Sequence, residues 1–368
     1  GPNRSDTWGR GMAPRTDPPD AAELLEVRDG VYAADLVIAA VAWFDFFSWL
    51  DANPSDLDGI CRGLGIAPRP ADVLCTLLAA MGLAERHGDR LLTTSLARRC
   101  LVDGAPHDLR PYFASLRERP ACRELAEVLR TGEPAAWSSA AGGTDWAAGL
   151  DDPGFAASLT AAMDARAWVL GPALASALDL RGARRVLDVA GGSGAYACAL
   201  VDRFPHLEAT VLERTPVDGI ARLLLAERGY GERIGVVAGD LFAALPEGHD
   251  VHLFSHVLHD WGEDDLRVAL GRSFAALPAG GMLVDHDTHI NRERTGPLPV
   301  ARYSVLLMHS TRGKCWSLSE LQLFLADAGF GEMAVRETAG GRSVVTARKP
   351  GRAPYANPLR AASSYSGK

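Results

Sequence analysis

The sequence has no long apolar run and no C-x-x-C pair of cysteines, and each absence excludes a class of protein. Charged residues interrupt the apolar stretches well before the roughly 18 residues that a membrane-spanning helix needs. The six cysteines are scattered, which indicates neither a structural zinc site nor a disulfide framework. The N-terminus also lacks the basic and then apolar pattern of a secretory signal, so we expect a cytoplasmic protein.

Long runs of basic residues are missing as well. The 368 residues include 38 Lys and Arg against 46 Asp and Glu, a formal net charge of −8, with no Lys/Arg-rich run. This balance argues against nucleic acid or an anionic membrane surface as a partner. The chain is longer than one typical domain, and its hydrophobic content of 47% is ample for a sizeable core.

The apolar pattern divides the chain into five parts, and no internal repeat is visible. We expect an expression remnant and disorder at the N-terminus, a mostly helical winged-helix arrangement, a helical linker, an α/β domain and a flexible tail. These parts correspond to residues 1–20, 21–104, 105–175, 176–348 and 349–368.

A winged-helix arrangement often binds DNA, so that function has to be weighed. Its third predicted helix, residues 70–81, has Asp72 as its only charge and no Lys or Arg. A helix that enters a DNA groove needs cations for phosphate and base contacts. The apolar face therefore predicts packing against another protein surface, and we expect it to be buried between two chains.

The most informative stretch is Val-Leu-Asp-Val-Ala-Gly-Gly-Ser-Gly at residues 186–194. A β-branched strand there contains Asp188 and leads into a turn with Gly191, Gly192 and Gly194, after which a helix is predicted to begin. Small residues let the backbone approach a ligand closely, and a helix N-terminus offers unpaired N–H groups. The layout predicts a nucleotide-type cofactor site in a Rossmann-like, doubly wound α/β fold.

Each of the next three predicted strands also ends in residues that carry chemistry. Glu213 closes the second strand, where a doubly wound sheet holds the hydroxyls of a ribose, Asp240 follows the third strand and His259 follows the fourth. Ligands of open α/β sheets bind outside the carboxyl ends of the strands. We therefore expect these residues to converge with Asp188 on one crevice.

These signals, in this order, resemble the S-adenosylmethionine-dependent methyltransferases. The string Leu258-His259-Asp260-Trp261 narrows the resemblance to the small-molecule O-methyltransferases of the plant caffeate type and their bacterial natural-product relatives. The resemblance covers about residues 30–348. It implies S-adenosyl-L-methionine as the cofactor, a small aromatic acceptor and a homodimer formed through the N-terminal winged-helix domain.

The resemblance also implies which residues hold the cofactor. Asp188 and the glycine loop correspond to the positions that hold its methionine end, and Glu213 corresponds to the ribose ligand. Asp240 and Leu241 fall on the adenine edge, and Ser255 is a further expected cofactor contact.

His259 falls on the general base of the family, and two positions depart from the family pattern. Methyl transfer from a sulfonium needs the acceptor oxygen held close to the methyl carbon while its proton is removed, and a histidine suits that task near neutral pH. Asp287 stands at one steering glutamate of the family, whereas Cys315 replaces the other and Ala190 replaces the first loop glycine. The alternative is that His259 only caps or packs beside Trp261.

The acceptor pocket is harder to predict. By the resemblance, the helix that begins near residue 155 roofs the pocket, so Met163 and Trp168 are candidates to clamp a flat ring, although both suit core packing equally well. His256, His309 and Cys315 are the other expected acceptor residues.

Two rival chemistries use the same residues. The string at 192–197 fits G-x-G-x-x-A, which suggests an NAD-dependent dehydrogenase, but that reading leaves the His-Asp-Trp element unexplained. His259, Asp260 and His309 could form a two-histidine, one-carboxylate metal site for carbon methylation next to a keto acid, although Asp260 more often caps the following helix. The replacement at Cys315 also leaves ring-carbon methylation open.

We therefore expect an aromatic-hydroxyl methyltransferase without a metal, and carbon methylation is the alternative. A cofactor-binding scaffold that had lost its chemistry would lack a base, yet the histidine is present.

Overall fold

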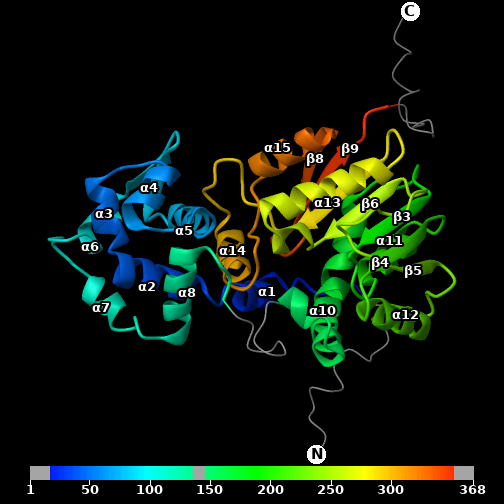
Figure 1. The fold of residues 1–368 in the computed structure, drawn as a ribbon, viewed down its shortest axis with the longest axis horizontal. Helices are drawn as coiled ribbons and strands as arrows, with labels where there is room; N and C mark the ends of the chain where they lie inside the picture. The colour runs from blue at the N-terminus through cyan, green and yellow to red at the C-terminus, as the bar shows by residue number, and fades with distance from the viewer. Residues whose placement is uncertain (1–16, 136–145, 352–368) are drawn as a thin grey trace, which may run out of the picture.

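The computed structural model describes residues 17–135 and 146–351 (Figure 1). The predictions for residues 1–16, for 352–368 and for the linker segment 136–145 lie outside the described residues.

The N-terminal part is helical, with one small hairpin. The strands β1 (Ala84–His87) and β2 (Arg90–Thr93) pair antiparallel, as the turn at residues 87–89 predicts. The helices are α1 (Ala22–Asp29), α2 (Ala33–Phe44), α3 (Phe46–Ala52), α4 (Leu57–Leu64), α5 (Pro68–Ala80), α6 (Ser95–Cys100), α7 (Arg110–Ala114) and α8 (Pro120–Thr131). No single helix among the described residues is long and apolar enough to cross a membrane; the bent pair Ala22–Phe44 and Phe46–Ala52 passes on length and composition alone.

Local sequence explains where these helices begin and end. The Asp56 side chain accepts a hydrogen bond from the Gly59 amide at the start of α4. The same helix ends at Gly65, whose φ of 65° is the left-handed conformation that a glycine adopts at low cost. Pro68 opens α5, where a missing N–H costs nothing.

The C-terminal part is a seven-stranded sheet with helices on both faces, which confirms the doubly wound α/β fold. Its strand order is β5-β4-β3-β6-β7-β9-β8, and only the last two strands run antiparallel to their neighbours. The strands are β3 (Arg185–Val189), β4 (Glu208–Glu213), β5 (Ile234–Ala238), β6 (Val251–Ser255), β7 (Met282–Asp287), β8 (Gly331–Glu337) and β9 (Ser343–Arg348). The chain runs outward from β3 to β5 and then returns to β6, so the carboxyl ends of β3 and β6 flank the switch point where such sheets bind ligands.

The helices sort onto the two faces of this sheet, as Figure 1 shows. Helices α10, α11 and α12 pack together on one face, and α13 and α15 pack on the other. Helix α14 joins the sheet to the N-terminal part through contacts with α1, α2 and α5. These elements are α9 (Trp146–Gly149), α10 (Pro153–Ala177), α11 (Ala195–Arg203), α12 (Val217–Glu227), the short 3-10 turn η3 (Leu258–Asp260), α13 (Glu263–Ala276), α14 (Leu298–Ser310) and α15 (Leu318–Ala328).

The prediction for the third N-terminal helix needs a correction. Helix α5 is longer than expected and includes Arg69, whose guanidinium donates to carbonyl oxygens of Met308, Thr311 and Gly313. Asp72 accepts from Lys314 at 2.6 Å. The apolar residues of α5 pack against α14 of the same chain and are buried there. They are therefore not exposed for contact with a second chain, which corrects the prediction for this helix.

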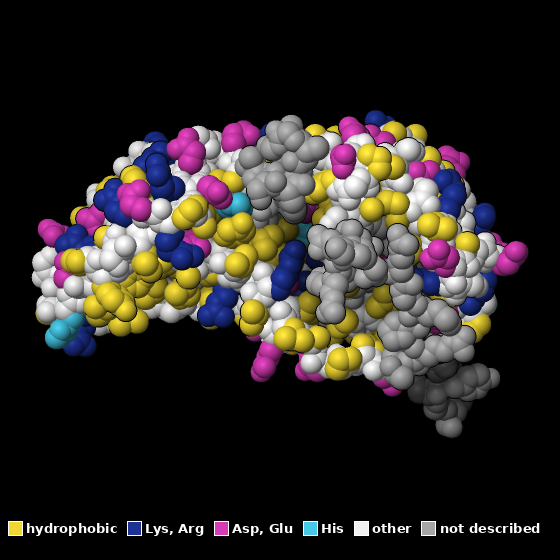
Figure 2. Space-filling view, turned by 90° about the horizontal axis from the view of Figure 1, so that it is seen from below, with side chains coloured by type: hydrophobic (Ala, Val, Ile, Leu, Met, Phe, Trp, Pro, Cys, Tyr) yellow, Lys and Arg dark blue, Asp and Glu magenta, His cyan; other side chains and the backbone are white. Residues whose placement is uncertain are grey.

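Exposed apolar side chains lie elsewhere on the N-terminal part. Leu24 and Val27 on α1 are 75% and 79% exposed, and Tyr112 on α7 is 77% exposed. Figure 2 shows hydrophobic side chains over the N-terminal helices on the left of the view. Dimerisation through this region stays a prediction. We expect a dimer interface here to bury these exposed apolar side chains.

Candidate active site

A cavity of about 550 Å³ opens at the carboxyl ends of the parallel strands. Its walls come from one face of α10, the loop after β3, the end of β4, the segment 255–261 and helix α14. A second groove of about 410 Å³ continues past the ends of β4 and β5 and shares Ala190, Glu213, Leu241 and Trp261 with the cavity. The ends of the parallel strands therefore meet at one crevice, as the sequence predicts.

The loop after β3 is shaped by steric limits at three positions. A side chain at Gly191 would place a Cβ 2.4 Å from the Asp188 Cγ, so only glycine fits there. Gly192 has a φ of 57° and lines the cavity. Ala190 also lies in the left-handed region, with a φ of 52°, which explains why the family places a glycine there.

Two predicted cofactor residues, Asp188 and Gly194, do not line the cavity. The Asp188 carboxyl lies beneath Gly191 and is fully buried, and burial together with Glu213 raises its pKa to about 8. Gly194 has a φ of 81° and lets α11 begin close to Val211, where a Cβ would lie 3.1 Å from a methyl group. Both residues lie behind the loop and shape it, and their direct contact with the cofactor stays a prediction.

Glu213 is held where the cavity and the groove meet. Its two carboxylate oxygens accept hydrogen bonds from the backbone amides of Gly192 and Arg214, at 3.0 and 2.8 Å. Burial raises the pKa of Glu213 although these amides oppose the change. The residue links the glycine loop to the end of β4 and still lines both spaces.

Aromatic rings and an acidic loop border the groove beyond Glu213. Asp240 and Leu241 line it as predicted, and the Asp240 carboxylate accepts from the Phe242 amide at 2.9 Å. Phe242 and Trp261 meet edge to face, with ring centroids 4.7 Å apart. These aromatic walls suit a flat base. Phe242 was not among the predicted residues, although it directly follows Asp240 and Leu241 in the chain.

These features test whether the residues fit S-adenosylmethionine. The groove has flat apolar walls for an adenine, Glu213 offers carboxylate oxygens to ribose hydroxyls, and Gly191 and Gly192 leave the backbone open beside them. The donor set and the shape therefore fit the cofactor.

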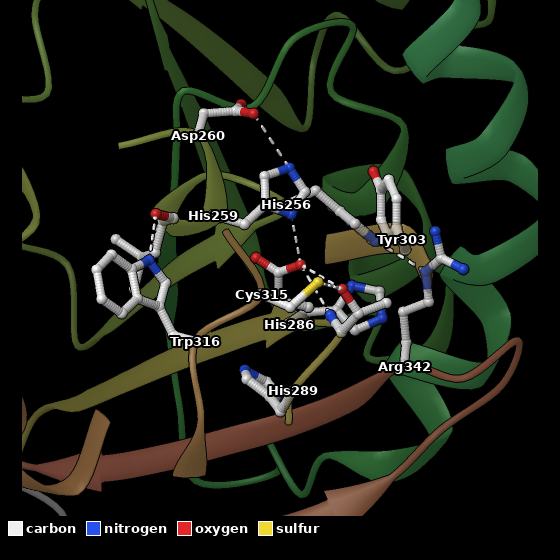
Figure 3. A network of polar contacts seen from close by, with 12 residues as sticks. His256, His259, Asp260, His286, His289, Tyr303, Cys315, Trp316 and Arg342 are labelled. Atoms are coloured by element: carbon white, nitrogen blue, oxygen red, sulfur yellow. Dashed lines mark hydrogen bonds and ion pairs between the residues drawn. The ribbon is translucent and has the colours of Figure 1, made fainter. Parts of the chain in front are cut away.

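His259, labelled in Figure 3, lines the cavity and forms a buried pair with Asp287 behind it. The His259 Nδ1 lies 2.6 Å from the Asp287 Oδ1, and its Nε2 lies 3.3 Å from the Asp260 Oδ1. Burial by itself lowers the pKa of His259, but the carboxylates of Asp287 and Asp260 outweigh burial and raise that pKa above the ordinary 6.5. Burial raises the pKa of Asp260 to about 6.

The segment 313–317 supports the turn that carries His259. A Cβ on Gly313 would lie 1.9 Å from the His259 carbonyl oxygen, so the close approach of the two backbones requires glycine. The Trp316 indole donates to the Leu258 carbonyl at 3.1 Å. The replacement of the family glutamate by Cys315 therefore does not disturb the backbone of the turn that carries His259.

Cys315 lies behind the pair and does not line the cavity. Its sulfur is 3.0 Å from the Thr288 hydroxyl, and the Thr288 amide donates to the Asp287 Oδ1 at 2.8 Å. Burial raises the pKa of the Cys315 thiol, so it stays neutral and brings no charge to the histidine. Cys315, predicted as an acceptor contact, is therefore buried behind His259 and Asp287 and outside the cavity lining.

Two further predicted acceptor residues point elsewhere. Trp168, on α10, does not line the cavity; its half-buried side chain packs against the hydrophobic core, with the Arg228 guanidinium 5.1 Å from its ring centroid. His309 stacks on Tyr32 at 4.0 Å, and its Nε2 lies 2.7 Å from the Glu124 carboxylate. Helical periodicity alone did not distinguish the core side of α10 from its cavity side.

The position of His309 also removes the proposed metal triad. His309 is paired with Glu124, whereas His259 is paired with Asp287 and Asp260. Among the described residues, no group of three or more His, Cys, Asp or Glu side chains is placed to hold a metal ion.

Met163, Ser255 and His256 do line the cavity, as predicted. His256 has a φ of 55°, and its Nε2 accepts from the Arg342 Nε at 3.1 Å. Because an arginine can only donate, Nδ1 carries the proton of His256 and faces hydroxyls of Tyr196 and Ser255, each at 3.2 Å. Burial and nearby cations lower the pKa of His256 well below 6.5, so this ring is neutral and already engaged.

Sequence reasoning missed a set of polar residues around these histidines. Arg166, Tyr196 and Tyr303 line the cavity, and Arg342 reaches His256 from the start of β9 (Figure 3). Arg166 is one helical turn from the predicted Met163, so its position on the same face of α10 was available as a signal. Nothing in the local sequence around Arg342 indicated its contact.

Comparisons with known proteins agree with this geometry. An O-methyltransferase domain model matches residues 122–331. The 3-hydroxy-5-methyl-1-naphthoate 3-O-methyltransferase of Streptomyces sahachiroi is 32% identical, over 92% of this chain and 97% of its own length. The tetracenomycin polyketide synthesis 8-O-methyl transferase of Streptomyces glaucescens is 29% identical, over 92% and 100%.

Among solved structures, an O-methyltransferase family 2 protein from Planctomyces limnophilus in complex with apigenin superposes with a TM-score of 0.82. It is 29% identical and covers 92% of this chain and 99% of its own.

Proposed function

This chain belongs to the S-adenosylmethionine-dependent O-methyltransferase family, and from that membership we propose that it methylates a hydroxyl group of a small aromatic natural-product intermediate, with His259 as the general base. The observation that carries the proposal is the 2.6 Å contact between the His259 Nδ1 and the Asp287 carboxylate, in a cavity that also fits the cofactor.

Asp287 determines which ring nitrogen does the chemistry. Its carboxylate accepts a hydrogen bond from the Nδ1–H group, so the neutral His259 ring has its lone pair on Nε2. Nε2 then takes the hydroxyl proton as the acceptor oxygen forms its bond to carbon. The resulting imidazolium lies between the carboxylates of Asp287 and Asp260, which stabilise its charge.

The cofactor supplies an electrophilic methyl group when it is bound. Gly191 and Gly192 would leave room for its methionine end, Glu213 would accept hydrogen bonds from its ribose, and Asp240 with Leu241 would border its adenine.

The remaining walls suit an aromatic acceptor. Met163, Leu306 and Leu307 offer apolar contacts, and Tyr303 meets the His259 ring edge to face with centroids 5.8 Å apart. The two relatives above are named for aromatic polyketide substrates, a naphthoate and tetracenomycin. We therefore include fused aromatic rings among the acceptors to test.

Product analysis tests the proposal. The protein is incubated with S-adenosylmethionine and a panel of phenols, catechols, hydroxynaphthalenes, aromatic amino acids and keto acids, and the products are fragmented in a mass spectrometer. We expect a methyl ether from a hydroxylated aromatic compound. A methyl group on ring carbon or next to a keto group would contradict the proposal, as would the absence of product from a protein that binds the cofactor.

A further inference from the structure

Arg166 has a charge that the proposed reaction does not use. It lies on α10 and lines the cavity together with Phe155, Leu159 and Met163, which follow one another at helical spacing. Its Nη1 donates to the Tyr303 hydroxyl at 3.1 Å, while its Nε is buried and has no hydrogen-bond partner. A guanidinium has five N–H donors, and the Nε donor of Arg166 is unused.

Other cations in the interior of the described chain have strong acceptors, which are backbone carbonyl oxygens for Arg69 and carboxylates for the rest. Arg228 donates twice to the Asp164 carboxylate, at 2.8 Å each, and Lys314 donates to two carboxylates at 2.6 and 2.7 Å. Arg342 donates to Asp29 at 3.1 Å. Burying a charge is costly unless a partner compensates it. Within the described residues, Arg166 forms no ion pair of this kind.

The carboxylates nearest to Arg166 are already committed. Asp29 accepts from Arg28 and Arg342, and Asp287 is paired with His259. Burial lowers the pKa of Arg166, but Tyr303, Tyr196 and these more distant carboxylates outweigh it, so the guanidinium remains protonated. A full positive charge therefore faces the cavity with hydroxyl groups as its nearest partners.

We propose that Arg166 binds a carboxylate of the acceptor, so that the substrate is an aromatic hydroxy acid and not a neutral phenol. This inference rests on the proposed function, since it requires the acceptor to lie in this cavity. A planar guanidinium matches a carboxylate with two parallel hydrogen bonds, which gives direction as well as affinity.

The position of Tyr303 relates this carboxylate to the reacting hydroxyl. Its hydroxyl accepts from Arg166, and its ring meets His259 at 81° with centroids 5.8 Å apart. One tyrosine side chain thus separates the guanidinium from the base. An acceptor that bears a carboxylate and a hydroxyl on one aromatic system would reach both groups at once.

The methionine carboxylate of the cofactor is the other source of the same chemistry. We favour the acceptor because Arg166 donates a hydrogen bond to Tyr303 on α14, beside His259, and not to Gly191 or Gly192, where the methionine end is expected. The two sources make opposite predictions for cofactor binding by an Arg166 variant.

Paired acceptors test the inference. Hydroxylated benzoates, naphthoates and anthracene carboxylates are each compared with the phenol that lacks the carboxylate, for example 3-hydroxy-1-naphthoate with 2-naphthol. We expect wild-type kcat/KM to be at least tenfold higher for the acid of a productive pair. Arg166→Gln should reduce that ratio to below about threefold through KM, and Arg166→Lys should retain part of it.

Arg267→Gln is the matched control, because this arginine lies on α13, pairs with Glu263 and Asp327 and is remote from the cavity. Its acid preference should equal that of the wild type. Binding of S-adenosylhomocysteine, measured by calorimetry, should change less than threefold in Arg166→Gln. A tenfold loss would assign the guanidinium to the cofactor and overturn the inference.

The remaining outcomes separate this inference from the proposed function. If the wild type methylates acid and phenol equally well, the carboxylate inference fails and the hydroxyl methyltransferase stands. If the wild type binds S-adenosylhomocysteine but methylates no member of any pair, both fail.

Discussion

The two halves of the active-site cavity are built in different ways. The cofactor half is assembled from successive strand ends, with Gly191 after β3, Glu213 at the end of β4 and Asp240 after β5. The acceptor half combines residues from segments that are far apart in the chain, such as Arg166 on α10 and Tyr303 on α14. Short-range sequence patterns therefore describe the first half well and the second half poorly.

His256 and His259 show the same contrast at close range. They are three residues apart and both are buried, yet the pKa of His256 is lowered and the pKa of His259 is raised. The difference comes from partners supplied by other elements, an arginine for His256 and two carboxylates for His259. The direction of the pKa change of a buried histidine thus depends on the partners that the tertiary structure provides.

Replacing the proposed base should have the largest effect. We expect His259→Ala to lower kcat by about 10²- to 10⁴-fold with cofactor affinity nearly unchanged, because the hydroxyl proton loses its acceptor. Steady-state kinetics and calorimetry measure the two quantities. His309→Gln is the control, since this buried histidine lies outside the cavity and should keep wild-type kcat. Near-full activity of His259→Ala would refute the base assignment.

Glu213 tests the cofactor half. We expect Glu213→Ala to weaken S-adenosylmethionine binding at least tenfold, because hydrogen bonds to a charged group contribute about 1.5–3 kcal/mol each. Glu208→Ala is a matched control on the opposite, exposed end of β4, where the side chain pairs only with Arg185. Unchanged affinity in Glu213→Ala, measured by calorimetry, would remove this residue from the proposed ribose site.

The pH profile tests why the two histidines differ. A general base works unprotonated, so kcat/KM should rise with pH through a pKa above 6.5, the direction that the carboxylates impose on His259. Asp287→Asn removes one of the two carboxylates that oppose the effect of burial on His259. The pKa of His259 should therefore fall, and the inflection of the kcat/KM profile should move to lower pH. The plateau rate should also fall, but by less than in His259→Ala.

The exposed Asp265→Asn variant on α13 controls for general charge effects and should keep the wild-type inflection. An inflection that stays in place in Asp287→Asn would show that another group titrates.

Ala190 tests the backbone of the glycine loop and should have the smallest effect. Its φ of 52° strains an alanine, so Ala190→Gly should raise the free energy of unfolding by up to about 1 kcal/mol in urea denaturation. Ala165→Gly, on the exposed side of α10, should instead lower it by about 0.5–1 kcal/mol. Destabilisation by both variants would contradict the strain argument.

Much of the fold could be predicted from the sequence because its signals are local. The hairpin at β1 and β2, the parallel strands and the antiparallel final pair depend on alternation, turn residues and capping within short segments. Glu213, Asp240 and His259 could be selected because each directly follows or ends a strand. Asp287 also ends a strand, β7, but its role beside His259 was expected from the resemblance, and the structure places it 2.6 Å from His259.

The errors arise where packing decides. Trp168 and Met163 lie on one helix and both fit an apolar stripe, but only Met163 faces the cavity. The His309 ring contacts the Glu124 carboxylate, 185 residues away in the chain. The Cys315 sulfur contacts the Thr288 hydroxyl, 27 residues away. No local pattern identifies such partners, because side-chain pairing across the fold is independent of sequence spacing.

By itself, the sequence determined the doubly wound sheet, the loop that leaves space for the cofactor and the histidine at the end of the fourth parallel strand, since backbone geometry and strand alternation act over a few residues. Only the tertiary structure decided which buried histidine is paired with carboxylates and which with an arginine. It also decided that Arg166 faces the cavity without an ion pair, because charges in a folded interior depend on whatever the packing brings within a few ångströms.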